Sequence, residues 1–546
     1  MREPPRAPPA PTLRRLDWRF VLPAPADGAP FAHLALLGAA DGLEALARLA
    51  VEAGVASRAS AGLPGAGLPT APVDAVAALE GADPLAAADR LAPGGVLWWE
   101  VRRRSPADLL THSPERLAAR LATAGLRLAG LYAVLPGFGA SKAFLPLDVR
   151  GALRWYVDHL LPSPTAARRL VEGALRAGLG LDARRLARVA PHLGVVAVRG
   201  DERPASALGH ADLPAALRAP GVRPLVFADA GNRVALLPFA ADGVHPLAVL
   251  KVPKRASVND RTEHEQAALH TIRAGLPAPL AAAIPAPLGI HRWGAVSVAH
   301  ENWLPGRALL RSSGGWGTSD AERVADLRGA AAWLAEFHAA AVLERGTWDD
   351  AAVARWVEEP AARYEARFGV TAEEAGLFAR LRERAREARG VPFALVWQHR
   401  DYNVWNVVRD GARVGVIDWE GARPGPPLCD LLHFAVHWHE AGRHLRDETS
   451  QRAGLRALFL EPPAHRNPLA RAAHEALAAY MTRVGLDARL LPVLLCYTWV
   501  ELALRRADQQ TDMGERPADP RAGNRNFAFI DVLAAGADRL FAGGGA

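Results

Sequence analysis

One stretch of the chain, residues 395–420, constrains its local fold more than any other. It contains His399-Arg400-Asp401 and then Asn406, in the pattern H-x-D-x4-N, and it closes on Asp418. Between Asn406 and Asp418, apolar residues lie on both sides of the pair Asp410-Gly411, which is typical of a tight β-hairpin. Such a hairpin returns the chain on itself. We therefore expect Asp418 to lie close to Asn406, where both could reach one cation.

These residue types suit the transfer of a phosphoryl group. A carboxylate beside an acceptor hydroxyl can orient it and take its proton, and Asp401 is our candidate for that role. Amide and carboxylate oxygens can hold magnesium on a triphosphate, which is the role we predict for Asn406 and Asp418. We place His399 with Asp401 as a catalytic-loop residue, and we expect it to pack and to hydrogen-bond the loop.

Two motifs in this stretch resemble the aminoglycoside phosphotransferase and choline kinase-like family, small-molecule kinases with the protein-kinase fold. They are Asp-x-x-x-Trp-Asn-Val-Val from Asp401 and Ile-Asp-Trp-Glu around Asp418. Protein kinases have Asp-Phe-Gly where this chain has Asp-Trp-Glu from Asp418. They also have a later Ala-Pro-Glu, and this chain lacks that sequence. Asp430 resembles the family aspartate that braces the catalytic loop. The resemblance implies ATP and Mg²⁺ as cofactors and a hydroxyl group as acceptor.

A smaller upstream lobe is also expected. The apolar strand 247–252 carries Lys251, one of only three lysines in the chain, beside Lys142 and Lys254. A compact ammonium group suits phosphate binding. A glutamate on the following helix can pair with Lys251 and aim it at the α and β phosphates. Glu265 fits the family pattern better than Glu263, and both remain open.

Residues 296–306 resemble the family hinge, whose backbone groups bind adenine. We include Glu301 and Trp303 among the predicted nucleotide-binding residues, although Trp303 fits a core position equally well. Residues 227–234 suggest a strand–turn–strand over the nucleotide, but they lack the glycine pattern of protein kinases. A plain hairpin explains this segment equally well.

The first two hundred residues alternate strand and helix patterns, which indicates a parallel α/β sheet. Leu91-Ala92-Pro93-Gly94-Gly95 before an apolar strand resembles class I S-adenosylmethionine-dependent methyltransferases. However, the turn 38–42 keeps only part of the expected glycine pattern, and the strand within 55–60 ends without an acid. We therefore favour a degenerate, Rossmann-like methyltransferase domain for packing or substrate presentation over one that binds S-adenosylmethionine.

The predicted organisation follows from these patterns. We expect an α/β Rossmann-like domain and then an α+β bilobal protein-kinase-like domain. The expected ranges are a flexible tail at 1–20, the α/β domain at 21–204 with a mainly helical part at 151–193, and the kinase domain at 205–546. Within the kinase domain, the small lobe covers 205–305 and the large lobe 306–546, where 327–340 has the pattern of a long supporting helix.

Composition sets further bounds. The chain has 546 residues and a formal net charge of +7, without a long basic run, so nucleic-acid binding is not indicated. Two cysteines, Cys429 and Cys496, exclude a disulfide framework, and the expected location is cytoplasmic. No apolar run has the length of a membrane span. His433, His437 and His439 could bind zinc, but we expect histidines of the core or of the acceptor pocket.

These observations predict an ATP-dependent kinase that phosphorylates a hydroxyl of a sugar, an amino-alcohol or an aminoglycoside-like small molecule. Three alternatives remain open: a catalytically silent nucleotide-binding fold, a bifunctional methyltransferase-kinase, and a scaffold of a glycan or metabolite pathway. The acceptor and the oligomeric state cannot be predicted from the sequence.

Overall fold

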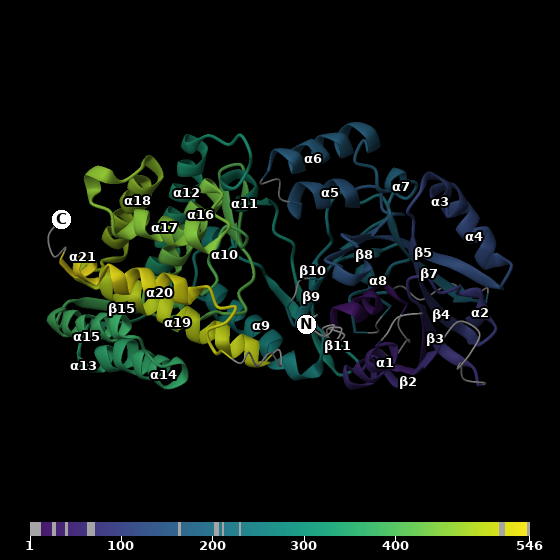
Figure 1. Ribbon diagram of the computed structural model, residues 1–546, viewed down its shortest axis with the longest axis horizontal. Coiled ribbons are helices and arrows are strands. Elements are labelled where there is room, and N and C mark those ends of the chain that lie inside the picture. The colour runs from purple at the N-terminus through teal and green to yellow at the C-terminus, as the bar shows by residue number, and fades with distance from the viewer. Residues whose placement is uncertain are drawn as a thin grey trace, which may run out of the picture. The chain divides into compact units, whose positions relative to one another are not determined.

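The computed structural model describes residues 13–23, 29–38, 42–62, 71–161, 165–200, 207–209, 212–228, 231–512 and 519–542 (Figure 1). The chain forms two compact units. Unit 1 consists of residues 1–161, 171–266 and 287–303, and unit 2 of residues 162–170, 267–286 and 304–546. Helices α6 (Ala166–Leu179) and α9 (Asn259–Ala274) have residues in both units.

Unit 1 is built on a large mixed sheet with strand order β11-β12-β10-β9-β8-β6-β5-β7-β4-β3-β1-β2. Strands β1 to β4 pair in parallel, and β7 is antiparallel to both β4 and β5. The strands are β1 Phe31–Leu37, β2 Ala56–Gly62, β3 Val73–Ala78, β4 Leu91–Arg102, β5 Leu126–Leu135, β6 Ala143–Pro146, β7 His192–Arg199, β8 Arg223–Phe227, β9 Arg233–Phe239, β10 Val249–Pro253, β11 Pro287–Trp293 and β12 Val296–Glu301. The helices are η1 Leu13–Val21, α1 Leu43–Glu52, α2 Leu85–Ala88, α3 Pro106–Thr111, α4 Pro114–Ala122, η2 Phe138–Ala140, α5 Ala152–His159, α7 Ala183–Leu186, α8 Ala215–Arg218 and η3 Ala256–Val258.

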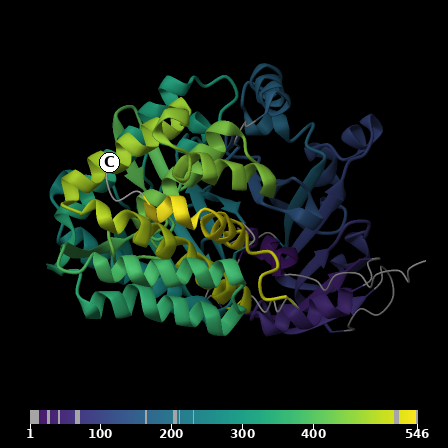
Figure 2. The same ribbon diagram turned by 60° about the vertical axis from the view of Figure 1, so that its left-hand side comes forward.

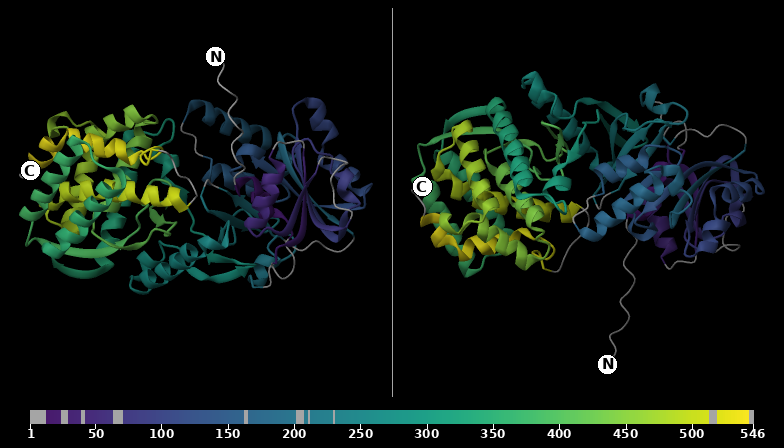
Figure 3. Two further views of the ribbon diagram at one scale, coloured as in Figure 1. Left: turned by 60° about the horizontal axis from the view of Figure 1, so that its bottom comes forward. Right: turned by 90° about the horizontal axis from the view of Figure 1, so that it is seen from above.

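The central strands of unit 1 are buried on both faces. In β4, Val96 and Trp98 belong to one hydrophobic cluster, whereas Leu97 and Trp99 belong to another. This division follows from the two-residue period of a strand, which sends neighbouring side chains to opposite faces. Figure 3 shows strands of this sheet edge-on, with helices on both sides. The predicted parallel sheet is present only from β1 to β4, because β7 runs antiparallel to β4 and β5, and β6 antiparallel to β5. The Rossmann-like and methyltransferase-like assignments stay predictions.

The sheet does not stop at the predicted domain boundary near residue 205. β6 and β8 pair in the register Ala143↔Phe227 and Phe144↔Val226, so strands from both predicted domains form one sheet. The chain passes between the two compact units at several points instead, the last of them between Trp303 and Leu304. The division at 205 remains a prediction about domains, and it does not coincide with a break in the sheet.

Part of the predicted flexible tail is ordered. Residues 1–12 lie outside the described residues, but Leu13–Val21 form the 3₁₀ helix η1. Leu16, Trp18 and Phe20 of η1 are buried in the hydrophobic core of unit 1. The segment is rich in Pro and Arg, which suggests a tail. Its few apolar side chains nevertheless pack in the core of unit 1.

Unit 2 is mainly helical and carries two small sheets, of order β13-β16-β17 and β14-β15-β18. The predicted supporting helix is α12, which begins at a capping box formed by Ser319 and Glu322. Figure 2 shows the helices of this unit, among which α19 and α20 contact each other. The strands are β13 Arg307–Ala308, β14 Val342–Thr347, β15 Pro392–Gln398, β16 Val407–Asp410, β17 Arg413–Val416 and β18 Arg423–Gly425. The helices are α10 Ala278–Ala281, α11 Leu309–Ser313, α12 Asp320–Ala340, α13 Asp350–Val353, η4 Ala354–Glu358, α14 Glu359–Phe368, α15 Ala372–Glu387, α16 Cys429–Arg443, α17 Glu448–Phe459, η5 Pro463–His465, α18 Pro468–Val484, η6 Ala488–Leu490, α19 Leu491–Asp512, α20 Asn526–Ala535 and α21 Ala537–Ala542.

Within the described ranges, no helix combines the length and the apolar character that crossing a bilayer requires.

Candidate active site

The loop between β15 and β16 in unit 2 holds Asp401 in a defined orientation. Its Oδ1 accepts a hydrogen bond from Asn403 Nδ2 at 3.0 Å, and its Oδ2 accepts one from Asn406 Nδ2 at 2.8 Å. Asn406 Nδ2 also donates to the Asp401 carbonyl at 2.9 Å. Both carboxylate oxygens are thus fixed by neutral amides, which orient the group without neutralising its charge.

A second set of contacts, made by Asp430 and His399, holds the backbone of this loop. The buried Asp430 accepts the backbone N–H of His399 at 2.6 Å and that of Arg400 at 2.7 Å, which agrees with the bracing role implied by the family resemblance. His399 Nδ1 lies 3.2 Å from the Asp401 N–H donor, and its Nε2 lies 2.9 Å from the Ile417 carbonyl. Both ring nitrogens of His399 thus have backbone partners, which fits the prediction that this residue packs and hydrogen-bonds the loop.

The predicted β-hairpin is present and brings the two predicted metal ligands together. β16 and β17 pair antiparallel from Val407↔Val416 to Asp410↔Arg413, and Gly411 in the turn has φ of 59°. Directly beyond the paired strands, the Ile417 N–H donates to the Asn406 carbonyl at 2.9 Å. Asp418 follows that bond, so the hairpin places it beside Asn406.

Two residues of this region have left-handed backbone conformations that are uncommon outside glycine. Arg400, directly before Asp401, has φ of 65°, and Asp418 has φ of 68°. Such conformations cost about 1–3 kcal/mol each and persist where the surrounding structure enforces them. Here they coincide with the two segments that carry the predicted catalytic and metal-binding carboxylates.

The electrostatic setting of Asp401 is unusual. Burial raises the pKa of Asp401 to about 7, the Arg505 guanidinium opposes that rise, and the neighbouring Asp418 and Glu420 carboxylates add to it. The negative charges of Asp418 and Glu420 thus disfavour the ionised form of Asp401. Arg505 was missed by the sequence analysis because it lies in α19, about one hundred positions beyond the motif.

The oxygen donors of this loop fit the Mg²⁺ that the family resemblance implies. Asn406 gives its amide nitrogen to Asp401, so Oδ1 is the atom with which it would bind a cation. Together with the Asp418 carboxylate it makes an all-oxygen donor set, which hard divalent cations such as Mg²⁺ prefer. The chemistry of these residues therefore fits the ion.

In unit 1, Lys251 pairs with Glu265 and not with Glu263. Lys251 Nζ donates to Oε1 of Glu265, whose side chain is fully buried, and Arg233 Nη1 donates to Oε2 at 2.7 Å. Glu263 instead accepts from the Ser297 hydroxyl at 2.7 Å. Arg233 was not predicted, and it gives Glu265 a second cationic partner.

The predicted hinge residues differ in what they contact. Glu301, at the end of β12, has its Oε1 3.4 Å from Lys251 Nζ and accepts from Gln266 Nε2 at 3.2 Å. Trp303 stacks on His245 with ring centroids 4.8 Å apart and packs against a hydrophobic cluster of unit 1. These contacts account for the position of Trp303 as a packing residue, and its contact with adenine remains a prediction.

The strand–turn–strand predicted over 227–234 is present in its described part. β8 ends at Phe227 and β9 begins at Arg233, while residues 229 and 230 lie outside the described residues. Its position over a nucleotide remains a prediction.

Two histidines of α16 contact one another, and one of them contacts a guanidinium. His433 Nε2 lies 2.9 Å from His437 Nε2, and the Arg525 guanidinium lies 2.9 Å from the same His437 nitrogen. A guanidinium at that place disfavours a second cation. No group of three metal-binding side chains of the His, Cys, Asp and Glu types occurs in the described part of the chain.

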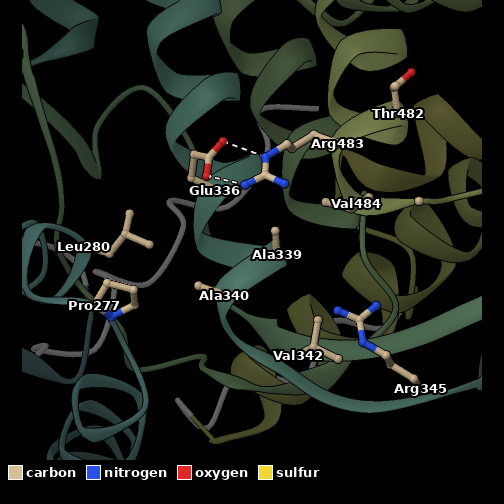
Figure 4. A pocket seen from close by; sticks show the side chains of 11 residues that line it. Pro277, Leu280, Glu336, Ala339, Ala340, Val342, Arg345, Thr482, Arg483 and Val484 are labelled. Carbon is tan, nitrogen blue, oxygen red and sulfur yellow. Dashed lines mark hydrogen bonds and ion pairs between the residues drawn. The ribbon is translucent and has the colours of Figure 1, made fainter.

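A pocket of about 470 Å³ in unit 2 lies apart from the catalytic loop. It is lined by residues of α10, α12, α18 and β14, including the ion pair of Glu336 and Arg483 (Figure 4). Asp401, Asn406 and Asp418 are not among its lining residues, so it provides no acceptor site for them.

We expect His439 to make the protein less stable in acid. Burial lowers the pKa of His439 to about 4, so only the unfolded state takes up its proton between about pH 6.5 and pH 4. Stability is therefore lost as the pH falls through this window, by up to about 1.4 kcal/mol per pH unit for one proton. His439→Phe should show a smaller loss than the unaltered protein in denaturant titrations at pH 7.5, 6 and 5. Parallel curves for the two proteins would contradict the prediction.

Comparison with known proteins finds a family match over the region that contains these residues. The profile of the phosphotransferase enzyme family matches residues 239–467, a range that includes Lys251, Glu265, Asp401, Asn406 and Asp418. No curated protein sequence matches the chain with significance.

Solved structures of several kinases resemble the chain weakly. The macrolide 2'-phosphotransferase MphH of Brachybacterium faecium is 19% identical, with 57% of this chain and 90% of that chain covered and a TM-score of 0.35. The amicoumacin kinase hAmiN, solved with AMP-PNP, Ca²⁺ and Ami, is 13% identical, with coverages of 59% and 90% and a TM-score of 0.34. A microcompartment-associated aminopropanol kinase is 16% identical, with coverages of 58% and 92% and a TM-score of 0.34. At these TM-scores the resemblance carries no conclusion about activity. The family profile does carry one: residues 239–467 match the phosphotransferase enzyme family, and the protein is a phosphotransferase.

Proposed function

We propose that this protein transfers the γ-phosphate of ATP to a hydroxyl group of a small molecule. The acceptor classes that we consider are sugars, amino-alcohols and aminoglycoside-like compounds. The observation that carries the proposal is the arrangement of the catalytic loop, where Asp401 is held by Asn403 and Asn406 beside the hairpin that bears Asp418.

Each residue of the loop has a distinct task in this proposal. Asp401 accepts a hydrogen bond from the acceptor hydroxyl, orients its oxygen and receives its proton as the new oxygen–phosphorus bond forms. Asn403 and Asn406 keep the carboxylate in one rotamer, and Asp430 fixes the backbone on which it lies. His399 completes this support.

Lys251 is the proposed ligand of the α and β phosphates. Its pairing with the buried Glu265 holds the ammonium group in one position, which reduces the entropy lost when ATP binds. Asn406 and Asp418 would hold Mg²⁺, which when bound supplies positive charge that offsets the charge of the triphosphate.

The acceptor is found by measuring ADP release with Mg-ATP against a panel of amines, sugars and aminoglycosides. The proposal expects at least one acceptor to stimulate release, and mass spectrometry should show that acceptor carrying one added phosphoryl group. Omission of Mg²⁺ should remove the stimulation. If AMP-PNP binds but no acceptor in a broad panel is phosphorylated, the silent nucleotide-binding alternative replaces the proposal.

We further propose that the N-terminal α/β part serves in packing or substrate presentation and not as a methyltransferase. Arg15 of η1 donates to both carboxylate oxygens of Glu100, which lies near the carboxyl end of β4. Ligands of open α/β sheets bind outside the carboxyl ends of parallel strands, and here the chain's own arginine lies at one such end. β2 contains no acidic residue.

S-adenosylmethionine should therefore leave the melting temperature of the full chain unchanged at millimolar concentration, because a ligand stabilises only the folded state that binds it. Mg-ATP serves as the positive control in the same assay. A rise with S-adenosylmethionine would support the bifunctional methyltransferase-kinase instead. The cytoplasmic location and the scaffold role remain predictions.

A further inference from the structure

The N-terminal helix η1 reaches the strand that carries Lys251. Asp17 of η1 accepts a hydrogen bond from Lys254 Nζ at 2.7 Å, and Arg19 Nη2 donates to the Lys254 carbonyl at 3.0 Å. The pair is deeply buried, since Asp17 is 0% and Lys254 is 3% exposed. Lys254 directly follows β10, three residues after Lys251. An ion pair thus links η1 to the residue that directly follows β10.

Aromatic packing fixes η1 on the sheet, so the position of Asp17 is well defined. Trp18 stacks on Trp98 of β4 with ring centroids 6.2 Å apart. Phe20 meets Trp293 of β11 edge-on at 5.7 Å. Asp17 directly precedes Trp18, the first of these two anchors. Lys254 therefore pairs with a carboxylate that cannot follow it if β10 shifts.

The same lysine is connected to the partner of Lys251. The backbone N–H of Lys254 donates to the Asn232 carbonyl at 2.7 Å. The next residue, Arg233, donates to Glu265 Oε2 at 2.7 Å, while Lys251 donates to Oε1 of the same carboxylate. Displacement of Lys254 would thus move both cations that hold Glu265.

A buried ion pair of this kind is poorly suited to stabilising a fold. Burial raises the pKa of Asp17 and lowers the pKa of Lys254, and in each case the partner's charge opposes the shift. The desolvation cost offsets most of the attraction, and the best-attested use of such pairs is to set position or register. Two of the chain's three lysines lie within four residues here, one for each buried carboxylate.

We propose that Asp17 and Lys254 are positioning residues for nucleotide binding, and that η1 sets the position from which Lys251 meets the phosphates of ATP. The inference rests on the proposed role of Lys251. It makes the N-terminal segment a working part of the phosphotransferase, although that segment lies more than two hundred residues before the range that the family profile matches.

The test measures the affinity of the full-length protein for AMP-PNP with Mg²⁺ by isothermal titration calorimetry. Asp17→Asn should weaken binding by about tenfold or more, since small displacements of binding groups have effects of this size. Arg15→Gln is the matched control, because it removes a different ion pair of η1, with Glu100 in β4, which does not involve β10. It should leave the affinity within about twofold of the unaltered protein.

A double-mutant cycle with Lys251→Met separates positioning from general destabilisation. If Asp17 acts through Lys251, Asp17→Asn should cause no further loss of affinity in the Lys251→Met background. Additive losses, or equal losses in Asp17→Asn and Arg15→Gln, would overturn the inference.

Failure of the proposed function has a different signature. If Lys251→Met itself leaves AMP-PNP affinity unchanged, Lys251 does not bind the nucleotide, and both the proposed role and the inference are wrong. If only Asp17→Asn is without effect, the role of Lys251 stands and the inference is wrong. If Asp17→Asn does not fold, the double variant Asp17→Leu/Lys254→Met removes both charges. Its affinity for AMP-PNP, measured in the same way, then decides whether the pair of Asp17 and Lys254 contributes to nucleotide binding.

Discussion

Asp401→Asn should reduce acceptor-dependent turnover by about 10²–10⁴-fold, the range typical of losing a positioned general base. The amide keeps the size of the side chain and can still contact Asn403 or Asn406, so the loop should remain folded. It cannot accept the proton of the acceptor hydroxyl. The measurement is the steady-state rate of ADP release at saturating ATP and acceptor, together with the affinity for AMP-PNP, which should stay within about threefold.

Asp410→Asn is the matched control for this variant. Asp410 is an exposed carboxylate at the end of β16, only nine positions away, where it pairs with Arg413 across the hairpin. Its replacement should leave turnover nearly unchanged. Similar losses in both variants would mean that the carboxylate of Asp401 has no special role.

Asp418→Asn should lower turnover by about a hundredfold and raise the Mg²⁺ concentration needed for half-maximal rate, because a carboxylate is a stronger ligand of Mg²⁺ than an amide. Asn tolerates the left-handed conformation that Asp418 adopts, with φ of 68°, so the backbone should not change. The measurement is a Mg²⁺ titration of the ADP-release rate at fixed ATP.

The two variants should differ in their response to the metal. Excess Mg²⁺ should recover part of the rate of Asp418→Asn but none of the rate of Asp401→Asn. If Asp418→Asn has the Mg²⁺ dependence of the unaltered protein, the assignment of Asp418 as a metal ligand is wrong.

The catalytic loop could be predicted from the sequence because its geometry is local. The hairpin follows from Asp410-Gly411 between apolar residues, and a short hairpin leaves little freedom for where Asp418 can lie relative to Asn406. The choice of Glu265 over Glu263 needed the structure. Residues two apart on a helix point in different directions, and only the position of the helix against β10 decides which one meets Lys251.

Long-range features could not be predicted in this way. The pairing of β6 with β8 joins residues more than eighty positions apart, and nothing in either strand specifies the other as its neighbour. The pairing of Asp17 with Lys254 spans 237 positions. η1 was missed for a related reason, since its apolar anchors are few and are surrounded by arginines and prolines. Its order comes from the sheet against which it packs.

The most direct test of the central claim is the transfer of label from γ-labelled ATP to an acceptor, by the unaltered protein and by Asp401→Asn, at saturating Mg²⁺. The account predicts label in the acceptor, released again by a phosphatase, and almost none with Asp401→Asn. Label that stays in ATP with every acceptor tested, or that reaches the acceptor equally well with Asp401→Asn, would contradict it.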